Sequence, residues 1–273
     1  MVPWLDALRA RLPGHASLLD ALVTICREDD RIRVLELQCS IARGAGDELS
    51  DLDVGIAVRD EEWEAVADEL PDRLRRLAET VDLLAHAMPE WGTRPHRRLF
   101  VQYEDGRQID LVVQPAGALL GRVPGAVVLY DPDGRLADER VVAVARATAD
   151  DVRTWEVLGW ESLANVVKYL ERGSPWEAHA RLNEARDLAL RLWAAAEGVP
   201  YPLFGLTSLL DVDPPRLPDR LDATAARAAI PELAVAARAC ADLLRAASAR
   251  ARTTLGATDI ESPMATWVID RLR

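Results

Sequence analysis

The pattern of the 273-residue chain changes near residue 145, and this change limits the folds it can adopt. Before it, short apolar segments alternate with turns rich in Gly, Pro and Asp, which is typical of strands joined by loops and a few helices. After it, apolar residues recur at three- and four-residue spacing over long stretches, which predicts amphipathic helices. The sequence therefore predicts an α+β domain over residues 1–145, followed by an all-helical bundle over residues 146–273.

The first part should contain three helices, four strands and a hairpin. Helices are expected over 3–12, 17–28 and 61–80, with a kink or restart at Pro71. Strands are expected over 32–40, 52–58, 81–88 and 126–136. Residues 42–51 and 89–97 read as loops. In residues 98–113 two apolar runs flank an Asp-Gly pair, which favours a tight hairpin turn.

The second part should consist of helices and one irregular connection. Helices are expected from about residue 150 to the Gly-Ser-Pro break at 173–175, from Pro175 to about Glu197, over 231–251 and over 263–272. Ser174 and Pro175 suit the N-cap and first position of the second of these helices. Residues 199–220 contain five prolines and read as an irregular segment.

Composition excludes several classes of protein. Apolar residues make up 49% and charged residues 29%, so the chain is not mainly disordered. No apolar run reaches the roughly 20 residues that a membrane span needs, and charged Asp6 and Arg9 stand where a secretory signal would be apolar. The three cysteines are far apart and form no CxxC pair, which argues against a disulfide framework or a zinc site. We expect a cytoplasmic protein with no membrane partner.

The charge is strongly acidic and unevenly distributed. The net charge is −12, and residues 1–145 carry −10 of it, from 27 acidic and 17 basic residues. A nucleic-acid partner would need a basic face, so none is expected. An acidic surface instead attracts cations and cationic small molecules.

Two carboxylates at the start of a predicted strand are the first candidates for chemistry. Asp51 and Asp53 are two residues apart, which places them on one face of a strand. Such a pair repels itself unless a cation joins it, and Mg²⁺ prefers oxygen ligands of this kind. An isolated Asp-x-Asp is most often a surface turn, so the interpretation depends on the neighbouring residues.

The neighbouring residues suit phosphate binding. Ser40 follows a buried strand and begins a loop that contains Gly44 and Gly46, which could turn N–H groups and a hydroxyl toward a phosphate. Arg43 adds a guanidinium suited to phosphate oxygens. Asp110 lies on a later strand, from which it could bring a third carboxylate to the pair.

Together Ser40, Asp51, Asp53 and Asp110 resemble the nucleotidyltransferase superfamily with the polymerase-β-like fold. Its pattern is Gly-Ser, roughly ten residues, Asp-x-Asp and a third acid on a later strand. The match covers about residues 39–113. Within the superfamily the chain most resembles bacterial antibiotic nucleotidyltransferases such as the aminoglycoside adenylyltransferases, which have a catalytic domain with a mixed sheet followed by a helical bundle. One position departs from the pattern, because Cys39 stands where the family has glycine.

The resemblance implies a site and a reaction. Asp51 and Asp53 would bind Mg²⁺, and Asp110 would complete the metal site, act as general base, or do both. Ser40 and Arg43 would hold the β- and γ-phosphates of ATP, the co-substrate. AMP would pass to a hydroxyl of a small, cationic acceptor, an aminoglycoside-type antibiotic, which would make the enzyme a resistance factor.

The sequence leaves open the role of Lys168, two alternative functions and the oligomeric state. Lys168, the single lysine of the chain, could reach the triphosphate from the helical domain, although a solvated helix lysine is the commoner case. One alternative function is a protein AMP-transferase of the toxin–antitoxin type, which the length of the chain disfavours. The other is a degenerate nucleotide-binding protein in which Cys39 has abolished turnover. A monomer and a homodimer are both compatible with the sequence.

Overall fold

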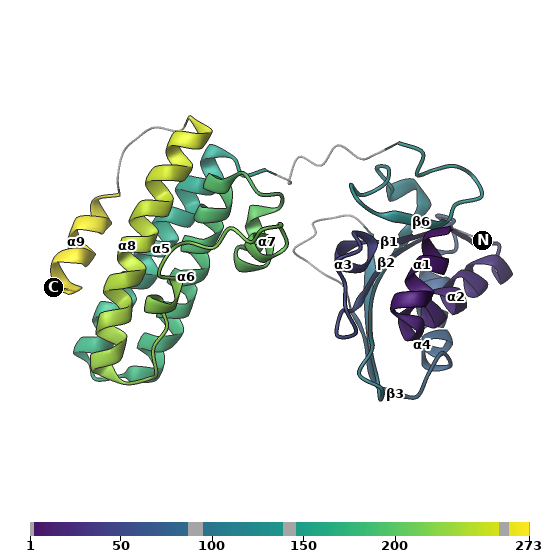
Figure 1. Cartoon of the computed structure of the whole chain (residues 1–273), viewed down its shortest axis with the longest axis horizontal. Helices are drawn as coiled ribbons and strands as arrows, with labels where there is room; N and C mark the ends of the chain where they lie inside the picture. The colour runs from purple at the N-terminus through teal and green to yellow at the C-terminus, as the bar shows by residue number, and fades with distance from the viewer. Residues whose placement is uncertain (1–2, 87–94, 139–145, 257–261, 273) are drawn as a thin grey trace. The chain divides into compact units, whose positions relative to one another are not determined.

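The computed structural model describes residues 3–86, 95–138, 146–256 and 262–272. The chain divides into two compact units, an N-terminal unit of residues 1–141 and a C-terminal unit of residues 142–273 (Figure 1). The N-terminal unit combines a mixed sheet with helices, and the described part of the C-terminal unit is helical. The predicted α+β class is therefore confirmed. The boundary predicted at residue 145 lies outside the described residues.

A six-stranded sheet organises the N-terminal unit. Its strands are β1 (Ile32–Leu37), β2 (Leu52–Val58), β3 (Thr80–His86), β4 (Arg97–Tyr103), β5 (Gln108–Pro115) and β6 (Val127–Tyr130). They lie in the order β3-β4-β5-β2-β1-β6. β2 and β5 pair in parallel, and the other neighbouring strands pair antiparallel. The β4–β5 hairpin predicted from the sequence thus returns the chain to the middle of the sheet, beside β2.

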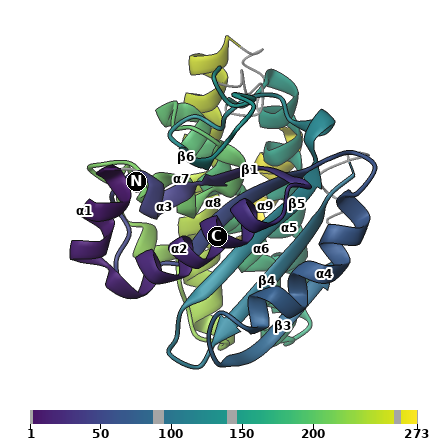
Figure 2. The same ribbon diagram turned by 90° about the vertical axis from the view of Figure 1, so that its right-hand side faces the viewer.

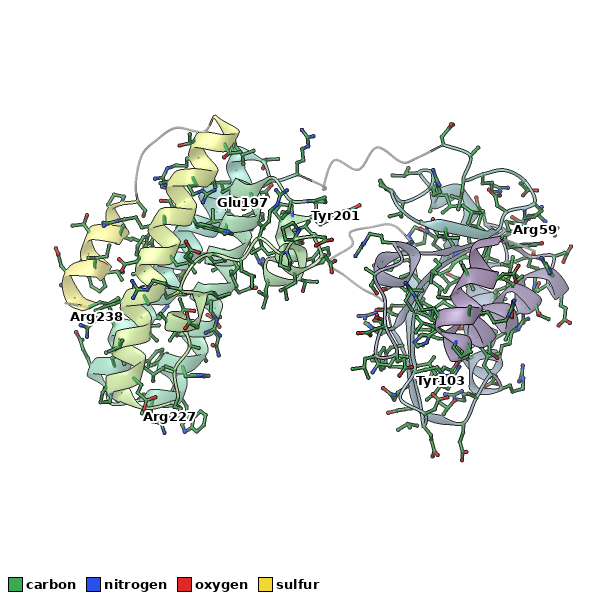
Figure 3. All side chains as sticks on the ribbon, viewed as in Figure 1. Arg59, Tyr103, Glu197, Tyr201, Arg227 and Arg238 are labelled. Atoms are coloured by element: carbon green, nitrogen blue, oxygen red, sulfur yellow. The ribbon has the colours of Figure 1, made fainter. Side chains whose placement is uncertain are left out.

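Two helices, α2 (Pro13–Glu28) and α4 (Trp63–Arg75), cover one face of this sheet, and α1 (Pro3–Arg11) packs on α2 (Figures 1 and 2). Apolar residues at alternate positions of the strands face these helices, as Ile109, Leu111 and Val113 of β5 do. Tyr103 is almost fully buried in this core (Figure 3), and its hydroxyl donates a hydrogen bond to the carbonyl oxygen of Leu74 at 3.0 Å.

The other face of the sheet is covered only in part. At the β1–β6 end, Val34 and Ala57 pack with Ala116 of a short 3₁₀ turn, η2 (Ala116–Ala118), and with Leu136. On β5 and β4, and at Asp53 of β2, the residues on this face are half-exposed, and most of them are polar. We refer to this region as the open face. The polar residues of the open face take no part in the apolar core, so this face is the candidate location of the functional site.

The C-terminal unit is built on three long helices, α5 (Ala149–Glu171), α6 (Pro175–Glu197) and α8 (Ile230–Leu255), and on a shorter α9 (Pro263–Leu272). Trp160 is fully buried in its core. A buried ion pair between Glu156 and Arg252, at 2.7 Å, joins α5 to α8. At the end of α6, Glu197 (Figure 3) binds Arg250 of α8. None of the described helices is long and apolar enough to cross a membrane.

The structure differs from the sequence prediction at several element ends. α2 begins at Pro13, because proline suits the first turn of a helix, whereas the helix was expected from residue 17. α4 continues through Pro71, since Leu70 and Leu74 on either side of it are buried against the sheet. Ser174 occupies the N-cap position of α6 without a capping hydrogen bond. The segment expected to be irregular, residues 199–220, includes a short helix, α7 (Leu206–Leu210), and a 3₁₀ turn, η4 (Pro202–Phe204). A second 3₁₀ turn, η5 (Leu221–Thr224), follows it.

Candidate functional site

The register of the parallel β2–β5 pair brings two predicted site residues together. Asp53 of β2 lies directly opposite Asp110 of β5. Residues paired in this way point to the same face of a sheet, and here that face is the open one. The charges of Asp51 and Asp110 both act on the carboxyl group of Asp53. The three acids expected from the sequence therefore gather in one place.

Their proximity changes the acidity of Asp53. Partial burial is the largest cause, and together with the repulsion from Asp51 and Asp110 it raises the pKa of Asp53 to about 6. A hydrogen bond with Cys39 and the charge of Arg43 act in the opposite direction. The carboxylate form is therefore incompletely stabilised by the protein alone, and a bound cation would stabilise it further.

The turn after β1 lies against Asp53. The N–H of Gln38 donates to the carbonyl oxygen of Asp53 at 2.8 Å, and one helical turn, α3 (Cys39–Ala42), follows. Cys39 is exposed as a residue, but its thiol shares a hydrogen bond with Asp53. Desolvation, together with the neighbouring charge of Asp53, raises the pKa of this thiol to about 12. Cys39 is therefore a neutral hydrogen-bonding group and not a nucleophile.

The backbone of Cys39 adopts a conformation that favours glycine. Its φ is +56°, in the left-handed region. For a residue with a Cβ this region costs roughly 1–2 kcal/mol. Glycine is the residue that the resemblance to the motif leads one to expect here, and the backbone conformation is one that suits glycine. The departure at Cys39 thus involves backbone conformation as well as side-chain size, which the sequence did not reveal.

The loop that contains Gly44 and Gly46 was expected to turn its N–H groups toward a phosphate, but these groups form hydrogen bonds within the loop. The N–H of Gly44 donates to Ile41, and those of Ala45 and Gly46 donate to the carbonyl oxygen of Ser40 at 2.9 and 3.1 Å. A Cβ on Gly46 would lie 2.4 Å from the Ile41 side chain, so the glycine serves close packing. The loop therefore uses these three N–H groups to fold onto itself. The candidates for phosphate binding that remain from the prediction are the side chains of Ser40 and Arg43.

Arg98 was missed in the sequence analysis, although it occupies the centre of the site. It lies on β4, and its Nε donates to Oδ1 of Asp110 at 2.7 Å while Nη2 donates to Oδ2. This hydrogen bonding raises the pKa of Arg98, and the charges of Asp110, Asp53 and Asp51 add to the effect. Phe100 pairs with Asp110 across the hairpin. Arg98 lies two residues from Phe100, so the hairpin register was the signal that could have found it.

Two buried side chains, those of His15 and Glu36, form hydrogen bonds to residues next to the site. His15 of α2 is buried, and its Nε2 lies 2.8 Å from the carbonyl oxygen of Ser50, which holds the chain just before Asp51. Because that partner only accepts, Nε2 must carry the proton. Glu36 of β1 is also buried, and it accepts a hydrogen bond from Gln38 at 2.8 Å. A Cβ on Gly55 would lie 3.2 Å from Glu36, so the glycine makes room for this pair.

The donor set fits a divalent cation in part. Asp51 and Asp53 supply hard carboxylate oxygens, and the raised pKa of Asp53 marks a charge that a cation would neutralise. Within the parts of the chain that the structure describes, no three His, Cys, Asp or Glu side chains form a group that could hold a metal ion. Asp110 faces Arg98 instead. The two-acid pair therefore fits Mg²⁺, and a three-acid site requires Asp110 to leave Arg98.

Lys168 lies in the C-terminal unit, apart from the other candidates. Its Nζ donates to Oδ1 of Asn165 at 2.6 Å and lies 4.6 Å from the centre of the Tyr169 ring. It is half-buried on α5. These contacts account for its position locally, and its expected role at the triphosphate remains a prediction.

Comparisons with known proteins add little to this description. No protein-family model matches the chain, and no curated protein matches it. Among solved structures, it aligns with the crystal structure of an aminoglycoside 6-adenyltransferase from Bacillus subtilis. The alignment covers 93% of this chain and 95% of that one, at 20% sequence identity and a TM-score of 0.41. A likeness at this level carries no argument about activity or substrate.

The conformation of Cys39 predicts a difference between two substitutions. Cys39→Gly and Cys39→Ala both remove the thiol, but only glycine adopts φ +56° without strain. We expect the glycine variant to be more stable than the alanine variant by about 1 kcal/mol. Urea unfolding followed by circular dichroism measures the difference. Equal stability, or a more stable alanine variant, would show that the turn does not hold this conformation.

The raised pKa of Asp53 predicts how stability depends on pH. The folded protein holds this proton up to about pH 6, whereas the unfolded chain releases it near the ordinary value of 3.8. The contribution of Asp53 to stability therefore falls as the pH rises through this window. Asp53→Asn lacks the titration, so without metal it should be more stable than the parent by on the order of 1–2 kcal/mol above pH 7.

The same reasoning makes this gain disappear as the pH falls below the ordinary value of 3.8, because the parent carboxyl is then protonated in both states. Unfolding by urea in EDTA across this range provides the measurement. Asp72→Asn, at an exposed position of α4, is the matched control and should follow the parent. Parallel curves for Asp53→Asn and the parent would contradict the assignment.

Proposed function

We propose that this protein is a nucleotidyltransferase that moves AMP from ATP to a hydroxyl group of a small molecule, with Mg²⁺ as cofactor. One observation carries the proposal: the parallel pairing that sets Asp53 beside Asp110 on an open sheet face. The end of β1, which leads into the Ser40 turn, pairs with the start of β2, which follows Asp51. Residues 1–145 would form the catalytic domain, and residues 146–273 would contribute to the acceptor site.

The nucleotide is bound mainly by side chains of the N-terminal unit. Asp51 and Asp53 would hold Mg²⁺, which when bound would neutralise the negative charge of the triphosphate. The hydroxyl of Ser40 donates a hydrogen bond to a phosphate oxygen, and the guanidinium of Arg43 binds the β- and γ-phosphates. Lys168 is the further residue that the sequence predicts for a positive charge at the triphosphate. Positioning and charge neutralisation supply most of the rate in reactions of this class.

Asp110 acts on the acceptor. Its carboxylate accepts the proton of the acceptor hydroxyl, whose oxygen attacks the α-phosphorus in line. The bond between the α-phosphorus and the bridging oxygen breaks, and pyrophosphate leaves. Asp110 pairs with Asp53 across the strands, and in this proposal it would serve as general base, as metal ligand, or as both.

The acceptor is proposed to be a polycationic, hydroxylated compound of the aminoglycoside type. The argument is electrostatic, because the N-terminal residues 1–145 carry a net charge of −10. A surface of this sign raises the local concentration of cations and repels anions. The enzyme would then act on antibiotics of this class and confer resistance to them.

Turnover tests the proposal directly. The protein with ATP, Mg²⁺ and a panel of aminoglycosides, lincosamides and other hydroxylated compounds should release pyrophosphate with at least one acceptor. Asp53→Asn should lower the rate by a factor of about 10³ or more, because it removes a metal ligand at the reacting phosphate. Asp72→Asn should retain the parental rate, since its side chain is exposed on α4.

The outcomes separate the competing functions. ATP binding that depends on Mg²⁺, without pyrophosphate release on any acceptor, would favour the degenerate nucleotide-binding protein. Transfer of AMP to a protein but to no small molecule would favour the toxin–antitoxin type. A folded Asp53→Asn protein with near-normal turnover would refute the assignment of the site.

Salt dependence tests the nature of the acceptor. If the acidic surface attracts a cationic acceptor, kcat/KM for the acceptor should fall steeply as salt rises, because ions screen charges over a Debye length of roughly 8 Å at physiological ionic strength. The KM for the Mg²⁺–ATP complex should change much less. Initial rates across a salt series, for charged and for uncharged acceptors, supply the comparison. Flat acceptor kinetics, or turnover of uncharged acceptors only, would contradict the electrostatic argument.

A further inference from the structure

The ion pair between Arg98 and Asp110 forms part of the acidic cluster of Asp51, Asp53 and Asp110. Both guanidinium nitrogens that face Asp110 donate to it, one to each carboxylate oxygen. Such a pair uses the two oxygens that a metal ion would otherwise approach. The positive charge of Arg98 also acts on Asp51 and Asp53. One side chain therefore compensates, in part, all three acids.

The position of Arg98 follows from the hairpin. Arg98 pairs with Val112 and Phe100 pairs with Asp110, so Arg98 and Asp110 are diagonal neighbours on the open face. The side chain of Arg98 is 32% exposed and that of Asp110 is 19% exposed. An ion pair that water reaches is held less firmly than a buried one, so it can exchange partners. The adjacent Arg97 lies on the same strand but binds Asp68 of α4.

We infer that Arg98 is the resident counter-ion of the acidic cluster and that it competes with a divalent cation for Asp110. In the metal-free protein the guanidinium neutralises Asp110. When a divalent cation binds to Asp51 and Asp53, Asp110 leaves Arg98 and becomes the third ligand. The inference rests on the proposed function for the nature of the metal site, but it concerns metal binding and not turnover.

The probe is Mn²⁺ alone, without nucleotide, binding to the full chain after treatment with EDTA and buffer exchange. Titration calorimetry or electron paramagnetic resonance gives the dissociation constant. Arg98→Gln removes the competitor and should bind Mn²⁺ about tenfold more tightly than the parent. Arg97→Gln removes the same charge from the neighbouring position and should change the affinity by less than about twofold.

A second pair of variants separates competition from the general effect of charge. In the Asp110→Asn background the competed ligand is absent, so Arg98→Gln should tighten Mn²⁺ binding by no more than about threefold. A tenfold effect that persists in this background would overturn the inference, because it would act through the electrostatic field and not through Asp110. An unchanged or weaker affinity of Arg98→Gln in the parent background would overturn it as well.

Circular dichroism verifies the fold of each variant. If Arg98→Gln does not fold, Arg98→Lys takes its place. Lysine keeps the charge but cannot bind both carboxylate oxygens at once, so about threefold tighter binding of Mn²⁺ is expected.

Measuring turnover together with Mn²⁺ binding distinguishes the proposed function from the proposed role of Arg98. If the protein catalyses Mg²⁺-dependent transfer but Arg98→Gln leaves the Mn²⁺ affinity unchanged, only the role of Arg98 is refuted. Absence of Mn²⁺ binding in parent and variant alike, with no turnover, refutes the proposed function and this inference together.

Discussion

The parallel pairing of β2 with β5 is the constraint on which the site depends. It sets Asp53 directly opposite Asp110, and neighbouring strands in a sheet are only about 5 Å apart. Two carboxylates at this separation repel each other, and Asp51 adds a third negative charge to the same place. The apolar core fixes the register, since a shift by one residue would turn Ile109, Leu111 and Val113 out of the core. The repulsion cannot be relieved by sliding the strands.

Several local contacts partly offset the repulsion among these carboxylates. Arg98 binds Asp110, the Cys39 thiol shares a hydrogen bond with Asp53, and the charge of Arg43 acts on the same carboxyl. Even so, the pKa of Asp53 stays at about 6. Cys39 also remains in a left-handed conformation that only glycine adopts freely. Strain and incompletely compensated charge at one place are typical of a site that is completed by a ligand.

Much of this arrangement was predictable from local sequence patterns. β2 matches its predicted bounds of 52–58, and the Asp-Gly turn correctly located the β4–β5 hairpin, because both depend on residues close together in the chain. Arg98 was not found, since its proximity to Asp110 depends on the register of two strands. The hydrogen bonds of the glycine loop and the φ of Cys39 depend on how the turn packs against β2. Lys168 belongs to a separate unit, and no local pattern relates it to the motif.

The charge of the N-terminal unit constrains the order in which ligands bind, if the proposed function holds. Residues 1–145 carry a net charge of −10, and three of their acids lie together on the open face. Free ATP is a polyanion, so this face would repel it. A divalent cation reverses the local sign, and if it also draws Asp110 away from Arg98, a guanidinium is left beside the cluster. Arg98 and Arg43 would then both be able to bind phosphate oxygens. The nucleotide should therefore enter as its metal complex or after the metal.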